Sequence, residues 1–236
     1  TKEKEHKLQS LFPGKPIRHT PNGIDGALWS RSPGDLKKVE TWRNRFPQAR
    51  LVLGFFGHLK RKKGVRFFLE CLDEMEEAGA THVHLVGELE PELEANLQAG
   101  VGFSWDHRPF LRNPLELTME YLKADFTVIP SFYDGTPNVL LESAALEIPV
   151  IGSNVGGLVD LVEDGTHGFL FRAGCREACQ SAIASAHHTS EPQRKEMGAA
   201  FHQDILTRCT PDHEADAILE LLCHAPARSP ELQSNP

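Results

Sequence analysis

Short apolar runs alternate with longer amphipathic stretches over most of the chain. Several of these runs are almost continuously apolar, which is typical of strands buried on both faces of a parallel sheet. Between the runs, apolar residues recur at helical spacing. The predicted strands are Ile17–Thr20, Leu51–Phe56, His82–Val86, Val101–Phe103, Phe126–Ile129, Pro149–Ile151 and Gly168–Phe171.

The clearest predicted helix begins at Val65 and ends near Ala78, with apolar residues three and four positions apart and Gly79 as its stop. Another helix is expected to begin at Ser32 and Pro33, because serine is a favoured N-cap and proline is favoured in a first turn. Toward the C-terminus the pattern is wholly helical. The helices predicted there are Arg176–His188, Pro192–Leu206 and Asp212–Cys223.

Alternation of strand, helix and strand implies right-handed parallel crossovers. The predicted fold class is therefore α/β, with a doubly wound, Rossmann-like parallel sheet and helices on both faces. Ligands bind at the carboxyl ends of the strands in such sheets, so the loops after Phe56, Val86, Ile129 and Ile151 are candidates for a site.

The same pattern divides the chain into four regions. Their expected bounds are 1–16 for the end of a preceding helix or a linker, 17–206 for the α/β domain, 207–224 for a C-terminal helix and 225–236 for a proline-rich, polar, disordered tail.

Composition narrows the class of protein. The chain has 236 residues, enough for one large domain with appendages. Its 25 Lys and Arg against 33 Asp and Glu give a net charge of −8, which disfavours a nucleic-acid or anionic-membrane surface. No stretch approaches the roughly 18 apolar residues of a membrane span. The cysteines form an odd set with no secretory leader, so reduced thiols and a cytoplasmic location are expected: Cys71, Cys175, Cys179, Cys209 and Cys223.

The first candidate loop reads Gly57-His58-Leu59-Lys60-Arg61-Lys62-Lys63-Gly64. Its glycines let backbone amides approach a ligand, and its four consecutive cations precede a helix, so a phosphate site is expected. Taken alone, a basic run of this kind is more typical of a solvated turn. The loop is neither a Walker A motif nor a GxGxxG fingerprint, so an NTPase or a Rossmann dehydrogenase gains no support.

The second candidate loop follows Ile129 and leads into a helix predicted over Asn138–Leu146. Thr136, Pro137 and Asn138 would occupy the cap and first turn of that helix, whose free N–H groups form a second cradle for an anion.

Two acids in this segment are candidate sugar ligands. Glu142 shares one helix face with Asn138 and would point to the strand ends, where a carboxylate accepts hydrogen bonds from sugar hydroxyls. Taken singly, Asp134 is typical of a turn acid and Glu142 of a solvated helix residue.

Together these segments form an ordered set of motifs. Asp134 and Glu142 have acid-x7-acid spacing, after a Pro-Ser strand end and before Ile148-Pro149-Val150. The set resembles the signature of retaining glycosyltransferases of the GT-B fold, glycosyltransferase family 4, over about Ile17–Leu206, the donor-binding half. The other matching motifs are Thr20-Pro21-Asn22-Gly23-Ile24-Asp25, Gly57 to Gly64, Val155-Gly156-Gly157 and Glu163-Asp164-Gly165.

The resemblance implies a role for each matching residue. Asp134 would contact hydroxyls of the transferred sugar, Glu142 would hold the ribose, and Lys63 would neutralise the pyrophosphate as it leaves. Asp134, Lys63 and His58 are thus the catalytic candidates. The implied nucleotide-sugar-binding residues are Gly57, His58, Lys63, Asp134, Gly135, Thr136, Pro137, Asn138, Val139 and Glu142.

The resemblance also implies which groups take part. The substrate would be a nucleoside-diphosphate sugar, and no cofactor or metal is expected, because the chain has no Asp-x-Asp pair and cations and helix dipoles would replace magnesium. A GT-B enzyme needs an N-terminal acceptor-binding domain, which the stretch before Ile17 is too short to supply. This half alone would therefore bind a donor without transferring it, and peripheral membrane contact through the missing half stays open.

The missing half has a structural consequence. The last helix crosses back to the acceptor domain in such folds, so its apolar residues are expected to be partly exposed here: Ile218, Leu219, Leu221 and Leu222. The alternatives to a transferase fragment are a non-catalytic nucleotide-sugar-binding module that acts through a partner and, less consistent with the donor motif, a GT-B-like epimerase or phosphorylase.

Three residues depart from the family pattern. His58 stands where the family has arginine, and histidine is charged mainly below about pH 6.5, so donor affinity is expected to weaken as the pH rises. Asp134 is one methylene shorter than the usual glutamate. Glu147 replaces a helix-ending glycine, at a cost of up to ~1 kcal/mol if the backbone there is left-handed.

Other residues offer weaker signals. Cys175, Cys179, His187 and His188, or Cys209 with His213, have spacings from which a zinc site is conceivable, although helical thiols are more often inert packing residues.

Two further segments lie near predicted strands. His82 and His84 share one strand face, where edge solvation or core hydrogen bonding is expected. The segment Phe103–Arg108 is read as a plain loop after a strand, with contact to a nucleobase as the alternative.

Overall fold

The computed structural model describes residues 1–20 and 22–223. Within these residues, six strands form one sheet in which every neighbouring pair is parallel. The predicted α/β class with a doubly wound parallel sheet is confirmed. The strands are β1 (Leu51–Leu59), β2 (Thr81–Leu89), β3 (Ser104–Arg108), β4 (Phe126–Ile129), β5 (Val150–Ser153) and β6 (Gly168–Phe171).

The order of strands across the sheet is β3-β2-β1-β4-β5-β6. The chain thus builds outward from β1 in one direction, then returns and builds outward from β4 in the other. Leu53 lies opposite Phe126 and Gly54 opposite Thr127, so β1 and β4 are neighbours. Ligands bind at this reversal in doubly wound sheets, because the two flanking connections leave on opposite faces and open a crevice between them.

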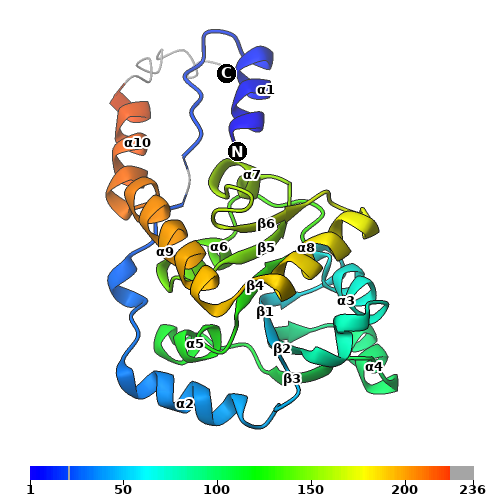
Figure 1. The fold of residues 1–236 in the computed structure, drawn as a ribbon. Helices are drawn as coiled ribbons and strands as arrows, with labels where there is room; N and C mark the ends of the chain where they lie inside the picture. The colour runs from blue at the N-terminus through cyan, green and yellow to red at the C-terminus, as the bar shows by residue number, and fades with distance from the viewer. Residues whose placement is uncertain (21, 224–236) are drawn as a thin grey trace, which may run out of the picture.

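Helices cover both faces of the sheet (Figure 1). One face carries α3, α4 and α8, and the other carries α5, α6 and α9, while α1 and α10 project beyond the sheet at the top of the view. The helices are α1 (Lys2–Leu11), α2 (Pro33–Arg43), α3 (Val65–Asp73), α4 (Pro91–Ala99), α5 (Pro114–Tyr121), α6 (Asn138–Ala145), α7 (Gly157–Leu161), α8 (Arg176–His188), α9 (Glu191–Arg208) and α10 (Pro211–Cys223). No helix in the described ranges is both long and apolar enough to span a membrane.

Alternation along β1 divides the core into two layers. Leu53 and Phe55 pack with Phe68 of α3 and Ile183 of α8 in one buried cluster. Phe56 points to the opposite face and packs in a separate cluster that contains Tyr121 of α5. Strands with apolar residues on both faces are stable only between two helical layers, which explains the uninterrupted apolar runs in the sequence.

Several helix predictions hold. Ser32 caps α2, and Asp35 accepts hydrogen bonds from the backbone N–H and the hydroxyl of Ser32. The helices predicted at Arg176–His188, Pro192–Leu206 and Asp212–Cys223 correspond to α8, α9 and α10, and the charged opening segment forms α1. The expected disordered tail, 225–236, lies outside the described residues.

Two of the predicted strands are wrong. Ile17–Thr20 forms no strand, because Ile17 is its only aliphatic side chain and no strand of the described sheet pairs with it. Val101–Phe103 forms no strand either, because β3 begins directly after it, at Ser104. The segment Phe103–Arg108, expected to be a loop, contains β3, whose alternating polar residues conceal its strand pattern.

The helix predicted over Val65–Ala78 is too long. The α-helix ends at Asp73, and a 3₁₀ turn at Glu76–Ala80 leads into β2. Acidic residues crowd the end of this helix, where the negative end of the helix dipole opposes them.

Glu147 has a left-handed backbone, with φ of 57°. This is the conformation in which a residue other than glycine was expected to cost free energy. It follows α6, and the N–H groups of Glu147 and Ile148 bond back to the carbonyls of Ala144 and Ser143, the pattern of a helix ending that favours glycine. Its carboxylate pairs with Arg31. A side chain at a left-handed position costs roughly 1–2 kcal/mol.

Replacing Glu147 tests this strain. Both Glu147→Gly and Glu147→Ala remove the pair with Arg31, but only glycine relieves the left-handed backbone. We expect the glycine variant to exceed the alanine variant by about 1 kcal/mol in free energy of unfolding, measured by urea denaturation. Equal stability of the two variants would show that the backbone strain is negligible.

Candidate active site

A cavity of ≈ 540 Å³ lies at the carboxyl ends of β1 and β2, beside the first turn of α6. Trp29, Phe110 and Leu111, which the sequence analysis did not place in the site, also line this cavity. An apolar wall with a few convergent polar groups is typical of small-molecule sites. The predicted site residues that line it are Gly57, His58, Lys63, Pro137, Asn138, Val139 and Glu142.

The two candidate loops converge at an ion pair. Lys63 Nζ lies 2.6 Å from Asp134 Oδ2, and the hydroxyl of Ser131 and the backbone N–H of Gly135 also donate to the Asp134 carboxylate. A smaller cavity of ≈ 40 Å³ lies between Lys63, Ser131 and Asp134, and it shares Lys63 and Pro137 with the larger one. The structure therefore brings together a cation and an acid that are 71 positions apart.

The local structure of the first loop differs from the expectation. β1 extends to Leu59, so Gly57 and His58 belong to the strand, and α3 begins only at Val65. Lys63 stands instead in a 3₁₀ turn, Arg61–Lys63. The cation is thus fixed by a tight turn between the strand and the helix.

Two glycines hold the Asp134 loop against the next connection. Gly157 donates its N–H to the carbonyl of Gly135 at 2.7 Å. Gly156 has φ of 57°, and a Cβ there would lie 2.0 Å from the carbonyl oxygen of Asp134. Only glycine allows this close approach. The Val155-Gly156-Gly157 motif therefore has a physical function, which is to support the loop that carries Asp134.

The Asn22-Gly23-Ile24-Asp25 segment, near the N-terminus of the chain, contacts the residues at the start of α6. Asn22 Nδ2 donates to Asn138 Oδ1 at 3.0 Å and to the carbonyl of Thr136 at 3.4 Å. Gly23 donates its N–H to Glu214 of α10. This segment therefore fastens the start of α6, while Pro21 of the motif lies outside the described residues.

The start of α6 is open to a ligand. Pro137 is its N-cap, and Asn138 and Val139 are its first helical residues. The first N–H groups of a helix have no acceptor within the helix, so they are available to an anion. The predicted helix Asn138–Leu146 and its anion cradle correspond to this element, although the cap is Pro137 and Thr136 precedes it.

Glu142 lies on the wall of the larger cavity, one turn into α6. The hydroxyl of the fully buried Tyr121 donates to Glu142 Oε2 at 2.6 Å. Burial raises the pKa of Glu142, and the Tyr121 hydrogen bond opposes that rise. Tyr121 stacks on Phe56 with ring centroids 3.7 Å apart. Sequence spacing gave no signal for Tyr121, because its contact with Glu142 forms only when β4 and the segments flanking it bring α5 and α6 together.

His58 is exposed, unlike most of the other predicted site residues. Its Nδ1 lies 2.8 Å from Glu88 Oε2, and Lys60 Nζ lies 3.1 Å from the same oxygen. Its ring lies parallel to that of Phe110, with centroids 5.8 Å apart. His58 therefore stands at the rim of the cavity and is tied to an acid from the neighbouring strand.

The conceivable zinc sites do not assemble. In the part of the chain that the structure describes, only His82, His84 and Asp106 form a group of three potential metal ligands. His187 bonds the Thr81 hydroxyl instead, and His213 bonds the hydroxyl of Thr210. His82 and His84 are completely buried and hydrogen-bonded, so the core interpretation of this pair is confirmed and edge solvation is wrong.

The fold and this cavity define a class. A doubly wound parallel sheet with helices on both faces is the architecture of a Rossmann-like α/β domain, here of the GT-B type. The chain belongs to the family described as glycosyl transferases group 1, whose model matches residues 50–188. The resemblance inferred from the motifs is thereby confirmed.

Relatives in sequence are glycosyltransferases. D-inositol 3-phosphate glycosyltransferase from Thermomonospora curvata is 31% identical, over 94% of this chain and 55% of the relative. Alpha-maltose-1-phosphate synthase from Mycolicibacterium smegmatis is 27% identical, over 85% of this chain and 54% of the relative. The chain spans about half the length of these curated relatives.

Solved structures show the same fold. Sucrose-phosphate synthase from Thermosynechococcus elongatus matches with a TM-score of 0.76 and 20% identity, over 94% of this chain and 56% of that one. The Anabaena protein HepE, solved in complex with UDP-glucose, matches with a TM-score of 0.71 and 21% identity, over 87% of this chain and 57% of that one.

The Tyr121 contact makes a pH-dependent prediction. An ionised Glu142 is the stronger acceptor for hydroxyl groups, so ligand affinity should fall as the pH drops through its raised pKa. Tyr121→Phe removes the hydrogen bond that stabilises the ionised form, so the pKa should rise further and the loss of affinity should begin at a higher pH. Titration calorimetry with UDP between pH 5 and 8 measures this shift.

The exposed Tyr133 provides the control for this experiment. Tyr133→Phe removes a tyrosine hydroxyl from the loop that carries Asp134, and it should leave the pH profile of UDP binding unchanged. Identical profiles for the wild type and Tyr121→Phe would contradict the role assigned to Tyr121.

Proposed function

We propose that this chain binds a nucleoside-diphosphate sugar and forms the donor half of a retaining, metal-independent glycosyltransferase. The observation that carries the proposal is the convergence of Lys63, Asp134 and the N-terminus of α6 around connected cavities. Lys63 and the free N–H groups of α6 suit a pyrophosphate, which carries two negative charges and many acceptor oxygens.

The remaining parts of the donor follow from the shape of the site. Glu142 lines the larger cavity, which Lys63 also lines, and would accept hydrogen bonds from the ribose. The apolar wall that contains Phe110 and Leu111 would hold the base. Asp134 lies on the smaller cavity, where the transferred sugar would follow the pyrophosphate.

Lys63 and Asp134 would change partners when the donor binds. In the free protein their opposite charges neutralise each other at 2.6 Å. A bound diphosphate would compete for Lys63, and the released Asp134 would accept hydrogen bonds from the sugar hydroxyls. A lysine held at the leaving group stabilises the charge that develops there, which lowers the barrier to transfer.

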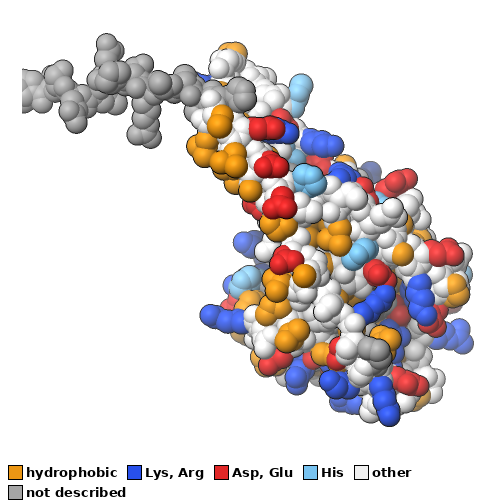
Figure 2. All heavy atoms as spheres, turned by 90° about the vertical axis from the view of Figure 1, so that its left-hand side faces the viewer, with side chains coloured by type: hydrophobic (Ala, Val, Ile, Leu, Met, Phe, Trp, Pro, Cys, Tyr) orange, Lys and Arg blue, Asp and Glu red, His pale blue; other side chains and the backbone are white. Residues whose placement is uncertain are grey.

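The acceptor half would pack against α10. Ile218, Leu219 and Leu222 of this helix are 46%, 56% and 66% exposed. Figure 2 shows hydrophobic side chains gathered on the projecting part of the molecule, where α10 lies. Exposed apolar groups on one helix are typical of a surface that another domain covers, and an N-terminal acceptor-binding domain fits this position.

A non-catalytic nucleotide-sugar-binding module is the second candidate. The His58 and Asp134 departures from the family pattern favour it, because they alter the two groups nearest the phosphate and the sugar. The two candidates share the donor site, and transfer activity in the presence of an acceptor-binding half distinguishes them.

A panel of UDP-, GDP- and ADP-sugars tests the donor proposal by calorimetry. At least one donor should bind without magnesium, and Glu142→Ala should weaken it by about tenfold, since a hydrogen bond to a charged group is worth ~1.5–3 kcal/mol. Glu142→Gln keeps an acceptor oxygen and serves as the conservative control. Binding that requires magnesium, or no binding of any donor, would refute the proposal.

Lys63 has a matched control in the adjacent lysine. Lys63→Ala should weaken UDP binding at least ~30-fold, since removing one partner of a close charge pair commonly costs ~2–5 kcal/mol. Lys62 stands in the same turn with an exposed side chain, so Lys62→Ala should change affinity less than threefold. Equal losses in both variants would indicate only a general attraction of the basic run.

Replacing His58 with arginine tests whether this residue contacts the phosphates. His58→Arg should tighten UDP binding at pH 8, because arginine is permanently charged and its planar fork matches phosphate oxygens. The same affinity for both proteins at pH 8 would show that His58 does not contact the phosphates.

A further inference from the structure

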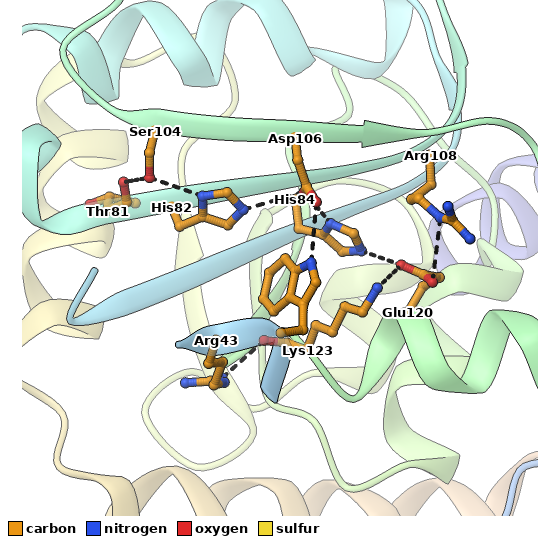
Figure 3. Close-up of polar contacts among 10 residues, drawn as sticks. Arg43, Thr81, His82, His84, Ser104, Asp106, Arg108, Glu120 and Lys123 are labelled. Carbon is orange, nitrogen blue, oxygen red and sulfur yellow. Dashed lines mark hydrogen bonds and ion pairs between the residues drawn. The ribbon is translucent and has the colours of Figure 1, made fainter. Parts of the chain in front are cut away.

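A buried polar cluster lies between β2, the edge strand β3 and α5 (Figure 3). None of His82, His84 and Asp106 lines the larger cavity described above. His82 and His84 of β2 have no exposed surface, and they point toward Asp106 of the edge strand β3. His82 Nε2 lies 3.3 Å and His84 Nδ1 lies 2.5 Å from Asp106 Oδ1. One ligand atom from each residue lies within 4.8 Å of the others.

The second nitrogen of each imidazole is also bonded. His82 Nδ1 lies 2.9 Å from the Ser104 hydroxyl, and His84 Nε2 lies 2.7 Å from Glu120 Oε2. Metal-bound histidines almost always have such a partner, which fixes the ring and leaves the other nitrogen free to coordinate. Both rings therefore present their remaining nitrogen to the same point beside Asp106.

Asp106 and Glu120 differ in their cationic partners. Glu120 has two permanent cations, Lys123 at 2.5 Å and Arg108 at 3.7 Å. Asp106 has no lysine or arginine within salt-bridge distance in residues 1–20 and 22–223, and its partners are the two imidazoles and the indole N–H of Trp42. A partly buried carboxylate usually pairs with a cation or coordinates a metal.

One of the two histidine contacts of Asp106 has the separation that a small tetrahedral ion requires. Zinc bonds of about 2.0–2.1 Å to nitrogen and oxygen place neighbouring ligands roughly 3.3 Å apart. The His82–Asp106 separation has this value, and the His84–Asp106 contact would lengthen by roughly 0.8 Å through rotation of the carboxylate. Two imidazoles and a carboxylate favour zinc over calcium or magnesium, which prefer oxygen ligands.

We propose that His82, His84 and Asp106 bind one divalent transition-metal ion of the zinc type. The ion is structural, because none of the three residues lines a described cavity where a substrate would fit. It joins the edge strand β3 to β2 beneath Trp42 of α2, whose ring centroid lies 5.1 Å from that of His82 and 5.0 Å from that of His84. The site is separate from sugar transfer, which is proposed to need no metal.

Titration of the metal-stripped 236-residue chain with zinc chloride tests the site. Calorimetry should detect binding with micromolar or tighter affinity, and the thermal unfolding midpoint should rise with zinc relative to EDTA. His82→Gln or Asp106→Asn should weaken this binding at least tenfold. Glu120→Gln, which keeps an acceptor for His84 but removes the negative charge that His84, Lys123 and Arg108 share, should weaken it about 10–100-fold.

The control is His188, an exposed histidine of α8 that bonds the Ala184 carbonyl. His188→Gln should bind zinc like the wild type. If the wild type fails to bind zinc, the cluster is held by hydrogen bonds alone and the proposal is wrong. If binding persists unchanged in His82→Gln and Asp106→Asn, the ion lies elsewhere, on thiols for example, and the proposal is equally wrong.

Anomalous diffraction locates the ion without any variant. Crystals of the wild-type chain grown with zinc should show an anomalous peak between His82 Nε2, His84 Nδ1 and Asp106 at the zinc absorption edge. A peak only at other positions, or none, would overturn the proposal even if the substituted proteins do not fold.

Discussion

The pairing of β1 with β4 is the constraint on which the candidate site depends. Leu53 and Gly54 lie opposite Phe126 and Thr127, so two segments more than 70 positions apart end at the same edge of the sheet. The 3₁₀ turn after β1 carries Lys63, and the loop after β4 carries Asp134. Without this pairing neither loop forms a site, because each alone is a basic turn or an acidic turn open to water. The parallel sheet converts them into one pocket beside a helix N-terminus.

The region behind this pocket is also held by specific side-chain contacts. α5 carries Tyr121, which bonds Glu142, and its neighbour Glu120, which bonds His84. Adjacent residues of one helix therefore connect the wall of the larger cavity with the buried cluster at β2 and β3. Phe56 stacks on Tyr121 and fills the space between them. A displacement of α5 would disturb both places together, since close-packed interiors transmit strain.

Two features of the C-terminal helix agree with the proposed acceptor half. α10 exposes apolar residues, and the segment from Asn22 to Asp25 joins α10 to the start of α6 through Glu214 and Asn138. The surface proposed for the acceptor half is thus linked by hydrogen bonds to the N-terminus of α6, where the phosphates of the donor are proposed to bind. Such a link would couple the two proposed surfaces.

Local sequence determined much of this protein. Apolar runs marked most strands, Ser32 and Pro33 marked the start of α2, and ordered motifs from Gly57 to Gly165 indicated the family and some of the residues that line the cavity. These features depend on neighbours a few positions away. Tertiary structure alone decided the rest: β3 was concealed by its polar residues, α3 ended early, and Tyr121 reached Glu142. The physical reason is that a polar side chain can be buried only beside partners that are distant in the chain. Local sequence does not determine which strands become neighbours and bring those partners together.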